Sequence, residues 1–209
     1  MIVLSHRGYW LQPEEKNAEV AFERTLGEGF GTETDVRDLD GCLVVAHDPP
    51  VKRNDTLAWS DVVEMFDGSG LPLAVNVKAD GLGMLIADSF AGRDIDWFAF
   101  DMSGPETRRY VDLKMPVFTR HSDVEPDPIF YSEASGVWLD SFGPTWFDRD
   151  VIKRHLDRGK RVCVVSCELH GRDPDRLWDQ LAELASGGWK SQLLLCTDRP
   201  KLARRRLLS

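Results

Sequence analysis

Short apolar runs rich in β-branched residues alternate along the chain with longer stretches whose apolar positions recur with a helical period. We interpret the short runs as eight strands, at residues 2–5, 31–36, 73–77, 97–100, 117–119, 137–139, 162–166 and 192–196. An additional run at residues 42–46 follows Asp40-Gly41, which is a strong signal for a tight turn. This run is therefore predicted to form a hairpin arm that extends the second strand.

The stretches between the strands are predicted to be helices. They cover residues 19–29, 59–66, 82–90, 105–110, 128–133, 146–158 and 175–186, and a last helix begins at Pro200. Proline suits a first helical turn because its missing N–H group would have no partner there, as at Pro105 and Pro200.

The strict alternation of eight strands with eight helices predicts an α/β chain folded as a closed, minimal (β/α)8 TIM barrel. The 209 residues leave about 26 residues for each strand–helix unit, so a single domain over residues 1–209 is expected. The alternative is an open, doubly wound sheet. No glycine-rich nucleotide-binding loop is present to favour that alternative.

Composition narrows the class of protein. Hydrophobic residues make up 42% of the chain and charged residues 29%, as in an ordinary globular protein, and the net charge of −9 argues against nucleic-acid binding.

No apolar run approaches the roughly 20 residues that span a bilayer, so no stable membrane insertion is expected. The start of the chain does not resemble a signal peptide, which favours a cytoplasmic domain or one supplied with its signal removed. The four cysteines form no metal-binding pattern and are predicted to be reduced core thiols.

Polar residues gather where the predicted strands end, which is where a barrel of this kind carries its chemistry. The first strand ends in His6-Arg7, the second carries Glu33-x-Asp35, the hairpin arm ends in His47-Asp48, and the third strand ends in Asn76-x-Lys78. Residues two apart on a strand share a face, so Glu33 and Asp35 are expected side by side. Later strands end in further acids, namely Asp101, Asp140, Glu168 and Asp198.

Two adjacent carboxylates repel unless a proton or cation lies between them. Oxygen ligands without a cysteine–histidine cluster indicate Mg²⁺ or Ca²⁺. His6 and His47 are candidates for general acid and base, and Arg7 offers a forked donor suited to phosphate. This set favours phosphoryl-ester chemistry over acyl transfer, since no Gly-x-Ser-x-Gly motif is present.

These motifs closely resemble the glycerophosphodiester phosphodiesterase family. The resemblance is carried by Ser5-His6-Arg7-Gly8, Glu15-Lys16-Asn17, residues 31–37, Asp40-Gly41, His47-Asp48 and, near the end, residues 196–200. It implies a TIM barrel of the phospholipase-C-like phosphodiesterases. It further implies that His6 and His47 are the acid/base pair, that Glu33 and Asp35 bind the metal, and that Arg7 and Asn17 hold the phosphate.

The chain departs from this family at two places. Asn76-Val77-Lys78 stands where the family usually has Glu-x-Lys, so the metal site has one negative charge fewer unless Asp101 or Glu168 compensates. Only 28 residues separate His47 from Asn76, which leaves out the family's capping insertion. A barrel without that cap also resembles the sphingomyelinase D group, and the family's glycerol recognition is not carried over.

We therefore predict metal-dependent hydrolysis of a small phosphodiester to an alcohol and a phosphomonoester, with a cyclic phosphate formed first if a substrate hydroxyl attacks. Glu33, Asp35, Asn76 and Glu168 are the candidate ligands of Mg²⁺ or Ca²⁺, and Lys78 counters charge. Trp10 follows the His-Arg-Gly turn and is a candidate for lining the pocket. The alternatives are a sphingomyelinase-D-like or polymer-directed phosphodiesterase, a non-catalytic phospho-ligand-binding barrel, and a different barrel hydrolase. The oligomeric state is left open.

Overall fold

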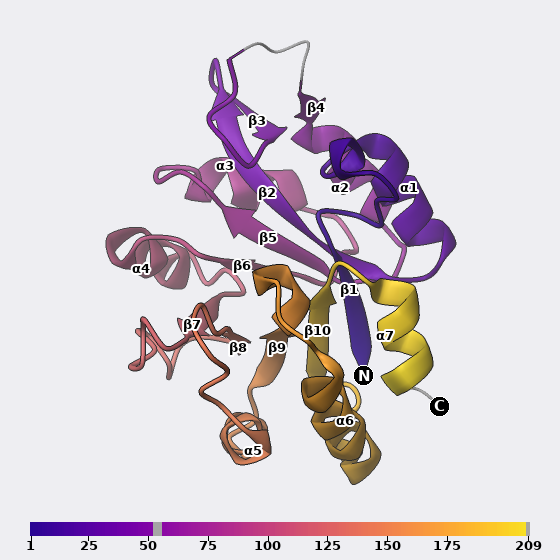
Figure 1. Cartoon of the computed structure of the whole chain (residues 1–209). Coiled ribbons are helices and arrows are strands. Elements are labelled where there is room, and N and C mark those ends of the chain that lie inside the picture. The colour runs from indigo at the N-terminus through magenta and orange to yellow at the C-terminus, as the bar shows by residue number, and fades with distance from the viewer. Residues whose placement is uncertain (52–55, 208–209) are drawn as a thin grey trace. The chain divides into compact units, whose positions relative to one another are not determined.

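The computed structural model describes residues 1–51 and 56–207 of the chain. The chain divides into two compact units (Figure 1). The N-terminal unit is His6–Val117, and the C-terminal unit consists of Met1–Ser5 and Phe118–Ser209.

The N-terminal unit is a sheet with helices between its parallel strands. Strands β2 (Gly31–Leu39), β5 (Leu73–Val77) and β6 (Trp97–Phe100) are parallel, and β3 (Cys42–Val45) and β4 (Leu57–Ala58) extend the sheet as an antiparallel arm beyond β2. The helical segments are a short 3₁₀ turn η1 (Pro13–Glu15), α1 (Glu19–Gly27), α2 (Trp59–Phe66), α3 (Gly83–Phe90) and α4 (Gly104–Asp112). Figure 1 shows the β2–β3 arm projecting as a long hairpin.

The register of β2 against β5 separates an apolar face from a polar one. Val36 lies opposite Val77, and both belong to the buried core together with Trp59 and Phe66 of α2. Side chains alternate along a strand, so Glu33, Asp35 and their neighbour Asn76 lie on the other face. A shift of one residue in the pairing would move every side chain to the opposite face of the sheet. Burial of the apolar side chains therefore specifies this register, which also keeps Glu33, Asp35 and Asn76 together on one face.

The C-terminal unit is an all-parallel sheet in the order β1, β10, β9, β8, β7. Its strands are β1 (Ile2–His6, of which Ile2–Ser5 pair here), β7 (Phe118–His121), β8 (Gly136–Leu139), β9 (Arg161–Val165) and β10 (Leu193–Thr197). The helical segments are α5 (Arg149–Asp157), η3 (Cys167–His170), α6 (Asp175–Leu184), η4 (Ala185–Trp189) and α7 (Pro200–Leu207). β10 is buried along its whole length, as expected for a parallel strand covered on both faces.

The predicted strands and the hairpin arm are all confirmed, and the fold is mixed α/β. The helix predicted at residues 128–133 is wrong. This segment is a turn in which Phe130 has a φ of 51°, and the N–H groups of Glu133 and Ala134 both donate to its carbonyl oxygen. The positive φ and the two prolines before it explain why the apolar spacing there does not propagate a helix.

Two smaller differences concern the start of one helix and one cysteine. The helix predicted from residue 146 begins only at Arg149, because the Asp148 side chain caps it by accepting from the N–H groups of Asp150 and Val151. Among the cysteines, Cys163, Cys167 and Cys196 are buried free thiols as predicted, but Cys42 is exposed.

Within the described ranges, no helix is both long and apolar enough to cross a membrane.

Candidate active site

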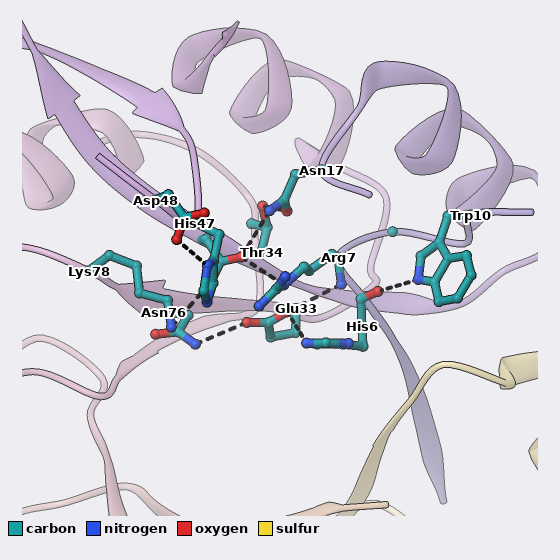
Figure 2. A network of polar contacts seen from close by, with 12 residues as sticks. His6, Arg7, Trp10, Asn17, Glu33, Thr34, His47, Asp48, Asn76 and Lys78 are labelled. Atoms are coloured by element: carbon teal, nitrogen blue, oxygen red, sulfur yellow. Dashed lines mark hydrogen bonds and ion pairs between the residues drawn. The ribbon is translucent and has the colours of Figure 1, made fainter. Parts of the chain in front are cut away.

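The end of β1 and the sharp turn that follows it place His6 and Arg7 at the polar face of β2 (Figure 2). Arg7 and Gly8 have φ values of 57° and 80°, and a Cβ atom on Gly8 would lie 2.7 Å from the Cβ atom of Ala21 in α1. Only glycine fits this close approach. The Arg7 N–H donates to the Glu33 carbonyl oxygen at 2.9 Å and the Gly8 N–H to Thr32 Oγ1 at 3.1 Å, so β2 holds the turn directly.

Asp35 is fully buried and is surrounded by donors. Its Oδ2 atom lies 3.0 Å from Arg7 Nε and accepts from Asn17 Nδ2 at 2.9 Å, while its Oδ1 atom lies 3.3 Å from Lys78 Nζ. Thr34 in turn donates to Asn17 Oδ1 at 2.9 Å, which fixes the orientation of the Asn17 amide. The predicted phosphate-binding residues Arg7, Asn17 and Lys78 therefore converge on one predicted metal ligand.

Glu33 is also fully buried, and its carboxylate meets a second set of groups. Oε1 accepts from Asn76 Nδ2 at 3.2 Å, Oε2 accepts from the Arg7 N–H at 3.2 Å, and His6 Nε2 lies 3.9 Å from Oε2. Burial, followed by the charge of Asp35, raises the pKa of Glu33 to about 7, although His6, Arg7 and Lys78 oppose the shift. Without an added cation, Glu33 thus holds a proton more readily than an ordinary glutamate.

His47 follows β3 and presents its ring beside a cavity. The His47 Nδ1 atom lies 2.9 Å from Asp48 Oδ1, and the Arg37 guanidinium donates to the His47 carbonyl oxygen at 2.9 Å. The cavity has a volume of about 750 Å³, and Arg7, Asn17 and His47 are among its lining residues. His47 is 44% exposed, so its ring is accessible to a ligand in this cavity.

Trp10 contacts the turn rather than the carboxylates. Its indole Nε1 donates to the His6 carbonyl oxygen at 3.1 Å (Figure 2). The Lys16 ammonium lies 4.4 Å from the centre of the indole ring. These contacts hold the His6 backbone in place. A role for Trp10 in lining the substrate pocket stays a prediction.

The solved structures that resemble the whole chain include two phosphodiester-cleaving enzymes. One is a phosphodiesterase from Oleispira antarctica in complex with the product sn-glycerol-3-phosphate, with 15% identity, a TM-score of 0.73, and coverage of 100% of this chain and 97% of that one. The other is a Ca²⁺-dependent phosphatidylinositol-specific phospholipase C from Streptomyces antibioticus, with 11% identity, a TM-score of 0.57, and coverage of 99% and 95%. The chain has the fold of the phospholipase-C-like phosphodiesterases.

The resemblance predicted from the sequence is thus confirmed at the level of the fold, and both neighbours are of TIM-barrel type. No protein-family model and no curated protein sequence matches the chain.

The donor set of this phosphodiesterase fold fits a hard divalent cation. Asn76 Oδ1 and Asp35 Oδ1 are both buried and accept no hydrogen bond from the described part of the chain, although Lys78 lies in ion-pair range of the latter. Together with Glu33 they offer two carboxylates and an amide oxygen, which are ligands that Mg²⁺ and Ca²⁺ accept. Over residues 1–51 and 56–207, no three His, Cys, Asp or Glu side chains gather as a metal site, so the amide of Asn76 is needed to complete the set.

Glu168 belongs to the C-terminal unit. There its carboxylate accepts short hydrogen bonds from the Ser166 and Thr197 hydroxyls, and a longer one from the Asp198 N–H at 3.2 Å. These contacts give Glu168 a local role in joining β9 to the end of β10. Its predicted role as a metal ligand stays a prediction.

Sequence reasoning overlooked two supporting residues. Thr34 orients Asn17, and Arg37 holds the backbone of His47. Arg37 stands two residues beyond Asp35 on β2, and this spacing was the signal that would have placed it on the same face. Nothing in the sequence alone pairs Thr34 with Asn17, because that contact depends on how the loop after β1 returns to the sheet.

Proposed function

We propose that this protein is a metal-dependent phosphodiesterase that hydrolyses a small phosphodiester to an alcohol and a phosphomonoester, on a closed minimal (β/α)8 barrel. The observation that carries the proposal is the buried oxygen set of Glu33, Asp35 and Asn76 beside a histidine, an arginine and a lysine. The fold shared with two phosphodiesterases supports the reaction class.

Glu33, Asp35 and Asn76 would hold Mg²⁺ or Ca²⁺. When bound, the ion supplies Lewis-acid polarisation of a phosphate oxygen and neutralises charge that develops during displacement. The calcium dependence of one structural neighbour supports a divalent cation here. The half-buried Arg7 and Lys78, each already placed against Asp35, supply further positive charge at the phosphate.

His6 and His47 would move the protons. The Asp48 carboxylate beside His47 Nδ1 favours the tautomer with the proton on Nδ1, which leaves Nε2 as the basic atom. We assign His47 as the base and His6 as the acid of the first step. If the nucleophile is a neighbouring hydroxyl of the substrate, this step yields a cyclic phosphate, and the two histidines exchange roles when water opens it.

The bound product of one neighbour, sn-glycerol-3-phosphate, supports a small phosphodiester such as a glycerophosphodiester as substrate. The cavity beside Arg7 and His47, at about 750 Å³, has room for the alcohol part of such a molecule. A sphingomyelinase-D-like reaction is distinguished by its product. Phosphorus NMR of the reaction mixture would show whether a cyclic phosphate or a phosphomonoester accumulates.

A phospho-ligand-binding protein without turnover is the second candidate. It is favoured by the ion pairs of Asp35 with both Arg7 and Lys78, because these two cations already balance the charges of Glu33 and Asp35 without a metal. Purified protein should be assayed on bis(p-nitrophenyl) phosphate and glycerophosphocholine, with and without EDTA. Turnover that EDTA abolishes supports the phosphodiesterase, whereas tight binding of phosphate esters without turnover supports the binding protein.

A further inference from the structure

A second polar cluster lies at the carboxyl ends of the strands of the C-terminal unit. Asp140 directly follows β8, Arg120 lies on β7, and His170 ends the η3 turn after β9. The carboxyl ends of parallel strands meet at one edge of a sheet, which is where ligands bind in folds of this class. The proposed function uses none of these three residues.

His170 and Asp140 form a dyad. His170 Nε2 lies 2.8 Å from Asp140 Oδ1, and the same oxygen accepts from the Ser141 N–H at 2.7 Å. Asp140 is only 5% exposed, whereas the His170 side chain is 24% exposed. A buried carboxylate at Nε2 holds the imidazole in one orientation and leaves the other ring nitrogen, Nδ1, on the opposite side of the ring from that carboxylate.

An arginine and a serine beside the dyad carry unused donors. Arg172 donates from Nη2 to the Ser141 carbonyl oxygen and from Nη1 to Thr145 Oγ1 at 3.3 Å. Its Nε atom and the hydroxyl of Ser141 are buried and have no hydrogen-bond partner in the chain as described. Buried polar groups in folded proteins are nearly always paired, so two orphan donors on residues already bound to each other indicate a missing acceptor.

The other charged side chains around His170 are engaged in contacts of their own. Arg120 on β7 lies 3.8 Å from Asp140 and 3.3 Å from Glu125 of the following loop, and its guanidinium is 5.1 Å from the Phe142 ring centre. On the element that carries His170, Glu168 is occupied by the hydroxyls of Ser166 and Thr197. The Asp123 carboxylate accepts from the N–H groups of Phe142 and Gly143, at 2.8 Å each. Arg172 therefore has a donor, Nε, that no acceptor of the described residues occupies.

We propose that Asp140, Ser141, His170 and Arg172 form a binding site for a phosphoryl group. Arg172 Nε and the Ser141 hydroxyl donate to its oxygens, and His170 in its protonated form donates from Nδ1 while Asp140 balances the added charge. Guanidinium groups suit tetrahedral oxyanions because they present several donors in a fixed plane. The site lies within the C-terminal unit and does not depend on the proposed function.

The test is a titration of the full-length protein, followed through the imidazole ¹⁵N and ¹H resonances of His170. Inorganic phosphate and sn-glycerol-3-phosphate are added in separate titrations, with EDTA present throughout. Saturable shifts of the His170 resonances with either compound are expected. Equal affinity for both would assign recognition to the phosphoryl group alone, and tighter binding of the ester would add contacts to its alcohol.

Variants make the test specific. Arg172→Lys keeps the charge but removes Nε, and it should weaken the response of His170 to phosphate by about tenfold or more. Ser141→Ala should weaken it less, and it replaces the first variant if Arg172→Lys does not fold. Arg149→Lys is the matched control, because Arg149 is exposed and forms an ion pair with Glu183 on the surface. His170 resonances that respond to neither compound, or that respond equally in all variants, would overturn the proposal. The EDTA-sensitive turnover assay tests the proposed function separately, so the two can fail independently.

Discussion

The side-chain amide of Asn76 donates to Glu33 Oε1 at 3.2 Å across the β2–β5 pair. The contact leaves Asn76 Oδ1 buried and without a hydrogen-bond donor among residues 1–51 and 56–207. One neutral residue thereby relieves the repulsion between Glu33 and Asp35 and still offers an oxygen to a cation.

Asn76→Glu should lower the metal concentration needed for half-maximal activity, because it adds a negative charge to the ligand set. Turnover at saturating metal can still fall, since a more neutralised ion is a weaker Lewis acid. Activity is measured against Mg²⁺ and Ca²⁺ concentration for the wild type and the variant. Asn76→Gln is the control that lengthens the side chain without adding charge. An unchanged half-saturating concentration in Asn76→Glu would mean that residue 76 does not face the ion.

His6→Ala and His47→Ala should each lower turnover by about 10² to 10⁴, the range for loss of a general acid or base. Circular dichroism and thermal unfolding check that each variant is folded. His47 is 44% exposed, so its removal should cost little stability. Near-normal turnover in a folded variant would remove that histidine from the proton transfers.

Glu168→Gln should raise the metal concentration for half-maximal activity if Glu168 contributes charge to the metal set. Metal titration monitored by calorimetry measures this directly. Glu183→Gln is the control, since Glu183 is an exposed acid of the same unit that pairs with Arg149. An unchanged titration would leave Glu168 with only its contacts to Ser166 and Thr197.

Gly8→Ala should reduce the free energy of unfolding by about 2–4 kcal/mol, since it combines a left-handed backbone with a steric overlap. Its φ is 80° and the added Cβ atom would lie 2.7 Å from Ala21 Cβ. Gly29→Ala separates the two costs, because Gly29 has a φ of 69° but nothing within 4 Å of its added Cβ atom. Urea unfolding of both variants measures the difference. Equal losses would show that α1 moves to accommodate the methyl group.

Stability should fall as the pH drops from about 6.5 toward 4, owing to His155. Burial, followed by the nearby His121, lowers the pKa of His155 from 6.5 to about 4. Its ring lies between Tyr131 Oη at 2.8 Å and His121 Nδ1 at 3.0 Å. Between these two pH values the unfolded chain binds a proton that the folded chain does not, so protons favour unfolding.

Urea unfolding at several pH values between 4 and 7 tests this. His155→Gln should be less stable at pH 7, because it loses a buried hydrogen-bond partner, but it should show a shallower decline below pH 6.5. Burial also lowers the pKa of His121, so part of the decline should remain. A decline as steep as that of the wild type would assign the pH dependence to other groups.

The positions of the strands along the chain and the residue types of the site could be predicted from sequence patterns alone. Alternating apolar and polar positions are local, and the period of two on β2 places Glu33 and Asp35 on one face in any sheet that buries Val36. The turn pair Asp40-Gly41 likewise needs no tertiary context to predict the β2–β3 hairpin. The motif around His6 and Arg7 indicated phosphodiester chemistry for the same reason, since its residues are close in the sequence.

Contacts between segments that are distant along the chain could not be predicted, because they depend on how the whole chain folds. The amide of Asn17 is engaged by Asp35 and Thr34, because the loop after β1 folds back onto β2, and its predicted role in holding phosphate stays a prediction. The turn at Phe130, where a helix was expected, depends on one backbone dihedral that the apolar spacing does not reveal. The pairing of His170 with Asp140 joins residues 30 positions apart, and it exists because parallel strands bring their carboxyl ends to one edge of the sheet.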